Sequence, residues 1–449
     1  MMEIAQDSFM AWVVCMGAFF ALAGTVGIDT SFGIAIETII KELQISTYEV
    51  SWIQSIHSSS MFLFAFVSSF LMKKYGLRMI ILIGTIICCT SYIICGIFKS
   101  YVLIVTLYGI AGGAGSGLLY AAGNIACFQY FKTYETLASG LAMSGTGFGM
   151  IAVSLSCSYV VINFGYFGYF IALSLISSMS FLFAFSTFPL AKDYHIIKEG
   201  ELDGLNTKSS LNGIKSYSSS NESIKEESIA MIEKEKSNDS QTSKTKKLLV
   251  LIRDKRLLGY CLVQVFFELA YYVPVDFLPE MMRSDGISQL NADTTIAFIG
   301  FFILISKLIL ALILRYTNTN PVIISSISMF FLGFCCIAYT ICSTYKFYVV
   351  VTVAYGLVIS SVDMLIPFII LEFFDADRLD DGFGLIMLTK AFIPLWGSPI
   401  AGALHDWTGS YDMAFYTAGC LLFIGALTNL LVYWLHLKKL RQAVIREND

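Results

Sequence analysis

Apolar residues fall in long runs along the chain, and short polar breaks separate the runs. A helix needs about 20 apolar residues to cross the ~30 Å hydrocarbon core of a bilayer. Twelve runs approach or exceed that length, at about 9–35, 52–72, 79–98, 102–128, 136–161, 165–189, 257–282, 295–315, 320–342, 347–373, 382–404 and 411–436. The pattern predicts an all-α membrane protein with six helices, an interruption and six more helices.

The composition supports the same class. Apolar residues make up 56% of the chain and charged residues 14%, and the mean hydropathy is +0.72, which is outside the range of soluble globular proteins. The net charge of −4, without a basic patch outside loops, gives no support for nucleic-acid binding. The four histidines are not clustered with other metal ligands, and no nucleophile lies beside a base, so an enzyme is not indicated.

The interruption between the two sets of helices is strongly polar. Between Ala191 and Lys247 lie ten acidic residues, ten basic residues and eleven serines, which cannot bury enough apolar surface to order the segment. The sequence therefore predicts four parts. They are a six-helix bundle at 1–189, a disordered cytoplasmic linker at 190–250, a second six-helix bundle at 251–436 and a cytoplasmic tail at 437–449.

Positive charges predict the orientation in the membrane. If both ends are cytoplasmic, 23 of the 29 Lys and Arg residues lie on the inner side, four lie in outer loops and two lie within spans. Cytoplasmic loops of membrane proteins carry an excess of Lys and Arg. We therefore expect both termini to be cytoplasmic.

The two halves of the chain resemble each other at matching positions. Lys74-Tyr75 follows the predicted helix at 52–72, and Arg315-Tyr316 follows the helix at 295–315. A parallel six-plus-six repeat with a central loop is similar to the plan of the major facilitator transporters. In that plan the substrate site lies near the membrane midplane, between the halves.

Several motifs resemble one branch of that superfamily, the monocarboxylate transporter family. The clearest is YFKTYETLASGLAMSGTGFG at 130–149, and EVSWI at 49–53, KKYGLR at 73–78 and GSPIAGALHDWTGSY at 397–411 are also similar. The resemblance implies the major facilitator fold and a plasma-membrane transporter without a cofactor, apart from a proton that some members carry as co-substrate. It also implies, for many members, a single-span immunoglobulin-type ancillary glycoprotein as partner.

The chain departs from the family where the proton-coupled lactate and pyruvate carriers bind their anion. The first-helix lysine of those carriers corresponds here to Thr30, beside Asp29. Their aspartate and arginine, four residues apart, correspond to Lys307 and Ala311 in the helix at 295–315. Asp29 and Thr30 make the outer half-site acidic or polar. That would suit a zwitterion whose amine meets Asp29 and whose carboxylate meets Lys307.

Lys307 and Asp363 stand in the middle of otherwise apolar spans. A charge there costs roughly 2.5–3.5 kcal/mol on insertion scales, and intramembrane charges usually mark a transport path. We expect the two residues to pair across a cavity in the second half, where Lys307 would bind an anion or exchange a proton. The alternative is an inert packing pair, since a buried ion pair contributes little net stability.

The helix at 257–282 carries three polar residues at four-residue spacing, Glu268, Tyr272 and Asp276. A buried carboxylate can carry a proton, so Glu268 is the main candidate for proton coupling and Asp276 the second, unless Asp276 simply reaches the outer surface. Pro274 and Pro279 are expected to break this helix near its outer end.

Two further ionisable residues lie within predicted spans. His57 could line the cavity as a hydrogen-bond donor, or it could be a packing histidine. Lys390, placed towards the cytoplasmic end of the helix at 382–404, is equally compatible with an inner vestibule and with snorkelling to the interface.

A short basic loop follows the helix at 52–72. Lys74 and Arg78, with Gly76 at the turn, resemble the loop that latches the two halves of facilitator proteins together on the cytoplasmic side. Part of their role is the positive-inside rule itself.

These observations together predict an alternating-access transporter of monocarboxylates or related carboxylate-bearing organic solutes. Its site is expected between the helices at 9–35, 52–72, 257–282, 295–315 and 347–373. A facilitative carrier of aromatic amino acids and a solute sensor that does not transport remain alternatives.

Overall fold

The computed structural model describes residues 6–187 and 254–448, except 318, 342–343, 375–377, 397–403, 405–407 and 409. The expected linker at 190–250 lies outside these residues. The first half contains α1 (Phe9–Leu43), α2 (Thr47–Tyr75), α3 (Leu77–Ile97), α4 (Tyr101–Leu103), the π-helix η1 (Ile104–Gly112), α5 (Gly113–Tyr130), α6 (Glu135–Ser178) and α7 (Ser180–Ser186). The second contains α10 (Lys255–Ser284), α11 (Gln289–Tyr316), α12 (Pro321–Ile341), α13 (Tyr345–Met364), α14 (Ile366–Phe373), α15 (Leu379–Lys390) and α17 (Asp412–Asn448).

Ten helices among the described residues are long and apolar enough to cross a membrane. One of them, Glu135–Ser186, has 52 residues and would be about 78 Å long if straight, more than twice a bilayer core. The chain reverses within it at Gly165, where φ is 60°. Added Cβ atoms at Gly145 and Gly27 would lie 2.2 Å from Phe19 and 2.5 Å from Val153, so the first part runs parallel to α1. Added Cβ atoms at Gly24 and Gly17 would lie 3.6 Å from Ile176 and 2.8 Å from Phe183, so the second part runs antiparallel to it.

The segment Glu135–Ser186 therefore supplies two of the predicted crossings, and the first half has six. In the second half, the predicted crossing at 382–404 is described only as α15 and the residues up to 396. The all-α fold expected from the sequence is confirmed.

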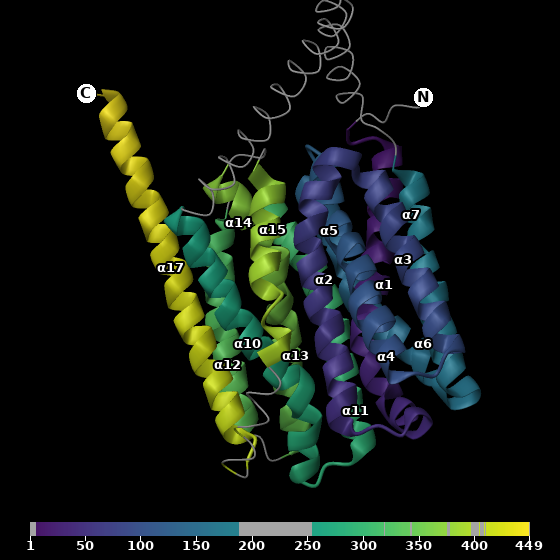
Figure 1. The fold of residues 1–449 in the computed structure, drawn as a ribbon. Helices are drawn as coiled ribbons and strands as arrows, with labels where there is room; N and C mark the ends of the chain where they lie inside the picture. The colour runs from purple at the N-terminus through teal and green to yellow at the C-terminus, as the bar shows by residue number, and fades with distance from the viewer. Residues whose placement is uncertain are drawn as a thin grey trace, which may run out of the picture.

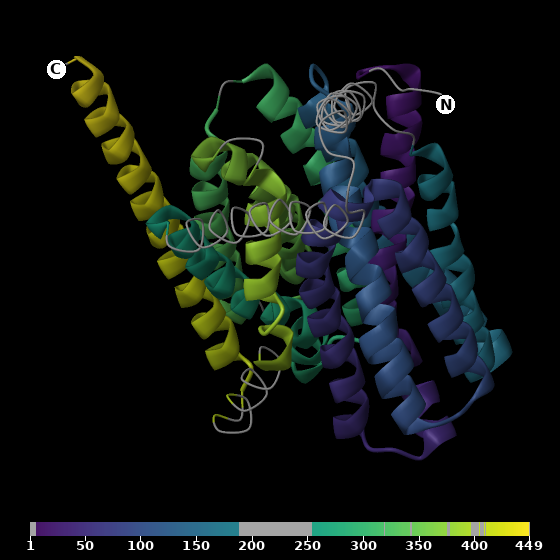
Figure 2. The same ribbon diagram turned by 45° about the horizontal axis from the view of Figure 1, so that its top comes forward.

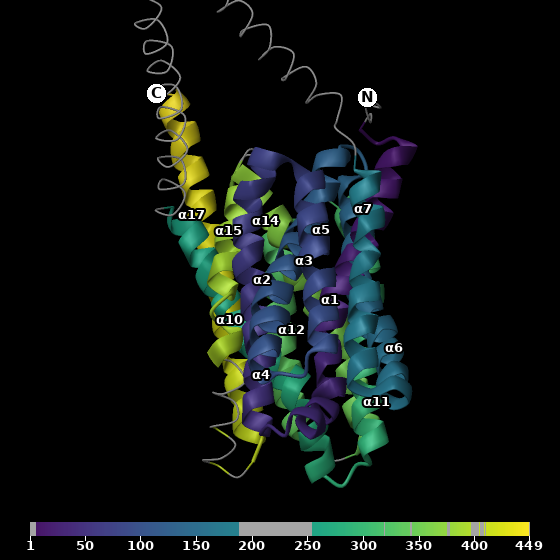
Figure 3. The same ribbon diagram turned by 45° about the vertical axis from the view of Figure 1, so that its right-hand side comes forward.

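The two halves lie side by side as separate bundles (Figure 1). The first half is drawn in purple to blue and the second in green to yellow, and Figure 2 shows the same division from a tilted view. The start of α1 and the end of α17 lie at one end of the bundles, which we call the terminal face. Figure 3 shows the helices running between this face and the opposite one.

The halves contact each other mainly through α6 with α11 and α2 with α15. Glycines allow the close approach of α6 to α11. A Cβ added at Gly140 would lie 2.2 Å from the Cβ of Ala311, and one at Gly147 would lie 2.6 Å from the backbone nitrogen of Leu304. Small residues at such interfaces let helix backbones pack closely in membranes.

Local sequence explains several helix boundaries. Ser46 and Glu49 form a capping box at the start of α2, which satisfies backbone donors that the helix leaves free. Gly76, between α2 and α3, has φ of 79°, a conformation that favours glycine. The predicted break at Pro274 and Pro279 was wrong, because α10 continues through both residues.

The glycine contacts between α1 and α6 lead to a prediction about stability. A Cβ at Gly149 would lie 2.0 Å from the carbonyl oxygen of Ala23, whereas one at Gly33 would meet nothing within 4 Å. We expect Gly149→Ala to lower the free energy of unfolding by about 1–3 kcal/mol or more, because the clash is with backbone. Thermal unfolding in detergent would show this, with Gly33→Ala as the matched control. Equal melting temperatures for the two variants would contradict the packing.

Candidate functional site

The central polar cluster is formed by Lys390, Glu268 and Asp363, from α15, α10 and α13. The Lys390 ammonium pairs with a carboxylate oxygen of Glu268 and lies 2.7 Å from Oδ1 of Asp363. The side chains of Lys390 and Glu268 are 1% and 4% exposed, while that of Asp363 is 29% exposed. Lys390 also lies 5.3 Å from the ring centroid of Phe62, in the first half. The site therefore contains a buried ion triad at the boundary between the halves.

The expected pair of Lys307 with Asp363 was wrong, because Asp363 is taken by Lys390. The Lys307 ammonium instead donates a hydrogen bond of 2.7 Å to Oγ1 of Thr146 in α6. Lys307 is 6% exposed, and among the described residues no carboxylate forms an ion pair with it. The expectation that Lys390 might snorkel was also wrong, since helix α15 ends with its ammonium in the interior.

These four residues make an electrically balanced set when all are ionised, with two ammonium groups and two carboxylates. Lys307 lies within electrostatic reach of both Asp363 and Lys390. Removing ions from water is costly unless they are paired and hydrogen-bonded. The balance explains how this many charges can be buried together.

A second polar cluster lies in the first half, around Asp29. The side-chain amide of Gln54 donates to Oδ1 of Asp29 at 3.0 Å, and the hydroxyl of Ser58 donates to the same oxygen at 2.7 Å. Thr30, predicted beside Asp29, bonds to the carbonyls of its own helix at Val26 and Gly27. The structure thus brings Asp29 together with α2, while the Thr30 hydroxyl is engaged within α1.

His57 is fully buried next to this cluster. Its Nδ1 lies 2.9 Å from the carbonyl oxygen of Tyr108, and the two rings stack with centroids 4.5 Å apart. A carbonyl can only accept, so Nδ1 carries the proton and Nε2 of the neutral ring is an acceptor. Nε2 of His57 and Oε1 of Gln54 are buried and have no hydrogen-bond partner among the described residues. The cluster therefore contains buried acceptors for which the described residues supply no donor.

The other two polar residues of α10, Tyr272 and Asp276, follow Glu268 by about one and two helical turns. Tyr272 packs edge-to-face against Tyr271, with ring centroids 5.5 Å apart. Asp276 belongs to α10, but its side chain lies outside what the structure describes. Of the three residues at four-residue spacing, only Glu268 is shown to join the triad.

Among the described residues, two polar contacts join the halves at the terminal face. Lys73 lies 2.7 Å from Asp381 of α15. Arg315 donates to the carbonyl of Thr133 at 3.3 Å, and its guanidinium lies 4.5 Å from the ring centroid of Tyr134. Lys73, directly before the predicted latch residue Lys74, therefore contacts the second half.

The three residues predicted for the latch have other surroundings. The Lys74 ammonium lies 5.0 Å from the ring of its neighbour Tyr75. Gly76 forms the turn between α2 and α3, and Arg78 is exposed.

Asp7 orders the loop that receives Arg315. Its carboxylate accepts hydrogen bonds from the backbone N–H groups of Lys132, Thr133 and Tyr134, at 3.0–3.4 Å. Slight desolvation opposes ionisation, but these donors outweigh it and lower the pKa of Asp7. Asp7 therefore stays ionised at neutral pH and keeps the Thr133 carbonyl and Tyr134 ring in place.

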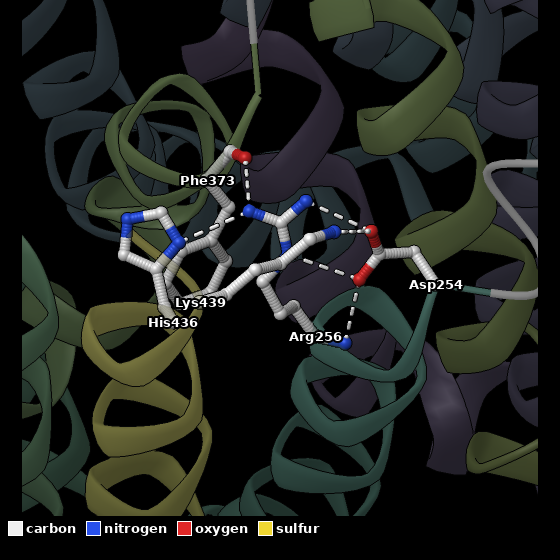
Figure 4. Close-up of polar contacts among 5 residues, drawn as sticks. All are labelled: Asp254, Arg256, Phe373, His436 and Lys439. Atoms are coloured by element: carbon white, nitrogen blue, oxygen red, sulfur yellow. Dashed lines mark hydrogen bonds and ion pairs between the residues drawn. The ribbon is translucent and has the colours of Figure 1, made fainter. Parts of the chain in front are cut away.

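Figure 4 shows a polar cluster around Arg256 that was not predicted from the sequence. Arg256 donates to both carboxylate oxygens of Asp254, at 3.0 and 2.8 Å, to the Phe373 carbonyl at 2.9 Å and to Nδ1 of His436 at 3.0 Å. Burial would raise the pKa of Asp254, but the hydrogen bonds from Arg256 outweigh it and lower the pKa. The cluster ties the start of α10 and the end of α14 to the interior of α17. The one local sequence feature that pointed to this cluster was Asp254, the N-cap residue of α10, two residues before Arg256.

Two helical bundles that enclose buried ions at their boundary define a polytopic membrane transporter. Residues 13–389 and 260–448 match the Major Facilitator Superfamily, and the chain belongs to that superfamily. It is a secondary transporter and not an enzyme.

Curated relatives agree with the resemblance noted in the sequence. Human monocarboxylate transporter 2 is 24% identical over 424 residues, which cover 93% of this chain and 84% of the relative. Human monocarboxylate transporter 10 is 22% identical over 440 residues, covering 96% and 79%. The similarity to monocarboxylate transporters is therefore confirmed along most of the chain.

Solved structures support the fold. The E. coli fucose:proton symporter FucP superposes with a TM-score of 0.66 and 14% identity, covering 94% of this chain and 98% of the symporter. The proton:xylose symporter XylE gives a TM-score of 0.68 with 14% identity, covering 94% and 95%. At this identity the likeness concerns the arrangement of helices.

Proposed function

We propose that this transporter carries monocarboxylates or related carboxylate-bearing organic solutes across the plasma membrane. The observation that carries the proposal is Lys307, a buried ammonium that donates a hydrogen bond to the neutral hydroxyl of Thr146. The names of its relatives, monocarboxylate transporters, point to the same class of substrate. As partner we propose a single-span immunoglobulin-type glycoprotein, which the family resemblance implies.

Lys307 has the chemistry to bind a carboxylate. A buried cation without a carboxylate partner gains most from an anion that reaches it, because attraction is strong in a low-dielectric site. Its present partner, Thr146, belongs to the other half of the molecule. A carboxylate that bonds to Lys307 and Thr146 would contact both halves at once, as a midplane transport site requires.

The charge balance of the site favours a proton as co-substrate. Two ammonium groups and two carboxylates sum to zero, so a bound monoanion leaves one excess negative charge. Protonation of one carboxylate restores the balance. Glu268 is the better candidate, because it is 4% exposed and Asp363 is 29% exposed, and burial disfavours the charged form. One proton per monoanion is the expected ratio.

Contacts between the halves support transport by alternating access. The polar contacts described between the halves extend from the ion site to the terminal face. At the ion site Ser59 donates to the Ala391 carbonyl at 2.5 Å, and at the terminal face Lys73 pairs with Asp381. We propose that the terminal face is cytoplasmic, in line with the distribution of Lys and Arg. These contacts would then close the path to the cytoplasm and would break when the bundles rock.

Replacing Lys307 tests the proposal. We expect Lys307→Ala to reduce the initial rate of labelled lactate or pyruvate uptake by about 30-fold or more, because truncating one partner of a buried charge pair costs about 2–5 kcal/mol. Lys307→Arg keeps the charge and should retain part of the activity. Uptake into proteoliposomes would be measured alongside Lys41→Ala, an exposed lysine paired with Glu37 on the surface.

Two results would count against this role. Uptake by Lys307→Ala within about twofold of the parent protein would exclude Lys307 as the anion site. No flux of any carboxylate in the parent protein, together with saturable binding, would favour the solute sensor.

Glu268 gives a separate prediction about pH. If Glu268 carries the proton, uptake by the parent protein rises as the external pH falls, and Glu268→Gln removes that rise because the amide stays neutral at every pH. Exchange of labelled for unlabelled substrate should persist, since Asp363 still pairs with Lys390. The measurement is uptake at two external pH values, with Glu37→Gln as an exposed control. A pH dependence that survives in Glu268→Gln would rule out this proton site.

The acceptor cluster around Asp29 favours a second candidate function, a facilitative carrier of aromatic amino acids. The unpartnered acceptors on His57 and Gln54 suit a substrate that brings hydrogen-bond donors, such as an ammonium group. In this case the carboxylate would meet Lys307 and the ammonium would meet Asp29.

Asp29→Asn separates the two candidates. For the second one, the variant should lose most uptake of labelled phenylalanine or tyrosine and keep uptake of lactate, because only the amino acid needs a negative partner. Both substrates would be compared in the same cells. Full amino-acid uptake by the variant would contradict the second candidate function, the facilitative amino-acid carrier.

A further inference from the structure

Two of the three ions in the triad have a proline at the same distance along the chain. Pro367 follows Asp363 by four residues, and Pro394 follows Lys390 by four residues. In a continuous helix the residue at i+4 donates its N–H to the carbonyl of residue i, and proline has no such donor. Each proline therefore removes the helical bond to the carbonyl of the ionic residue itself.

The helices are interrupted at these points. Helix α13 ends at Met364 and α14 begins at Ile366, with Leu365 as a turn between them. Helix α15 ends at Lys390, and residues 391–393 form a turn before a short helical stretch at 394–396. By contrast, α10 continues through Pro274 and Pro279. Proline alone does not break every helix here, and the two breaks coincide with the ions.

The break in α15 has consequences for Lys390. The ammonium belongs to the last residue of the helix, where the partial negative charge of the helix end stabilises a cation. The Lys390 carbonyl accepts from the N–H of Ile393 at 3.2 Å instead of from residue 394. An uninterrupted helix would remove both features.

The same break supplies a contact with the other half. The turn after Lys390 presents the carbonyl of Ala391, which accepts the hydroxyl of Ser59 from α2 at 2.5 Å. This contact involves the residue directly after Lys390. The position of the ammonium and the contact between the halves thus depend on one turn of backbone.

We propose that Pro367 and Pro394 are positioning residues for transport, which hold Asp363 and Lys390 at breaks in their helices so that the Lys390 ammonium meets both Asp363 and Glu268. The proposal rests on the proposed role of the ion site in substrate binding. It adds that the site requires the interrupted backbone as well as the charges.

The experiment compares Pro394→Ala with Pro274→Ala. Alanine restores a donor for the Lys390 carbonyl and favours a continuous helix, so Pro394→Ala should displace the ammonium. We expect the KM for labelled lactate to rise about tenfold, as small misplacements of a binding group reduce rates strongly, while the Tm in detergent stays equal or rises. Pro274→Ala should leave KM within twofold of the parent value.

Glycine at the same position provides a second test. Pro394→Gly also regains an N–H but disfavours helix, so its KM should stay closer to the parent value than that of Pro394→Ala. Pro367→Ala should raise KM as well. An unchanged KM in Pro394→Ala, or an equal rise in Pro394→Gly and Pro394→Ala, would overturn the positioning role.

Failure of the site itself gives a different pattern. Lys390→Ala, measured in the same assay, should raise KM or abolish uptake. If Lys390→Ala transports normally, the ion triad is not part of the substrate site, and the proposed role of the ion site in substrate binding is wrong. If Lys390→Ala fails and Pro394→Ala is normal, only the positioning role fails.

Discussion

The cost of burying charge inside a membrane protein governs this structure. Lys390, Glu268 and Asp363 are charged groups from three helices, and each would be expensive in an apolar interior unless it met a partner. Their contacts, at 2.7 Å for Lys390 and Asp363, fix the rotation of α10, α13 and α15 about their axes. The arrangement of the second half around the site depends on that constraint, because turning any one helix would leave a buried charge without its partner.

The first half is organised by close packing instead. Glycines on α6 bring its backbone against α1 on one side and α11 on the other, and van der Waals contact replaces electrostatic pairing. The two halves therefore differ in the main interaction that positions their helices. A tightly packed bundle that carries an acceptor-rich cluster at Asp29 faces a bundle that carries the paired ions.

The fold followed from the sequence because the bilayer imposes it. Lipid leaves no alternative to helices for long apolar runs, so hydropathy was enough to locate them. The reversal at Gly165 lies at the boundary between the crossings predicted at 136–161 and 165–189. The site was harder. Lys307, Asp363 and Glu268 were identified as buried ions, but the partner of Asp363 was not, because that depends on the depth and rotation of Lys390 at the end of α15. The contacts of Arg256 with Phe373 and His436 join residues distant in sequence, which periodicity cannot detect.

The two contacts at the terminal face respond differently to their surroundings. Lys73 and Asp381 form a partly exposed ion pair, so dissolved salt screens it. Arg315 meets a backbone carbonyl and the uncharged ring of Tyr134, so salt affects these contacts less than it affects a pair of full charges. A rise in ionic strength would therefore weaken the Lys73–Asp381 pair before it weakens the Arg315 contacts. The halves would then begin to separate by tilting about the Arg315 contact. The direction of this movement would depend on the difference between the two contacts as well as on the symmetry of the repeat.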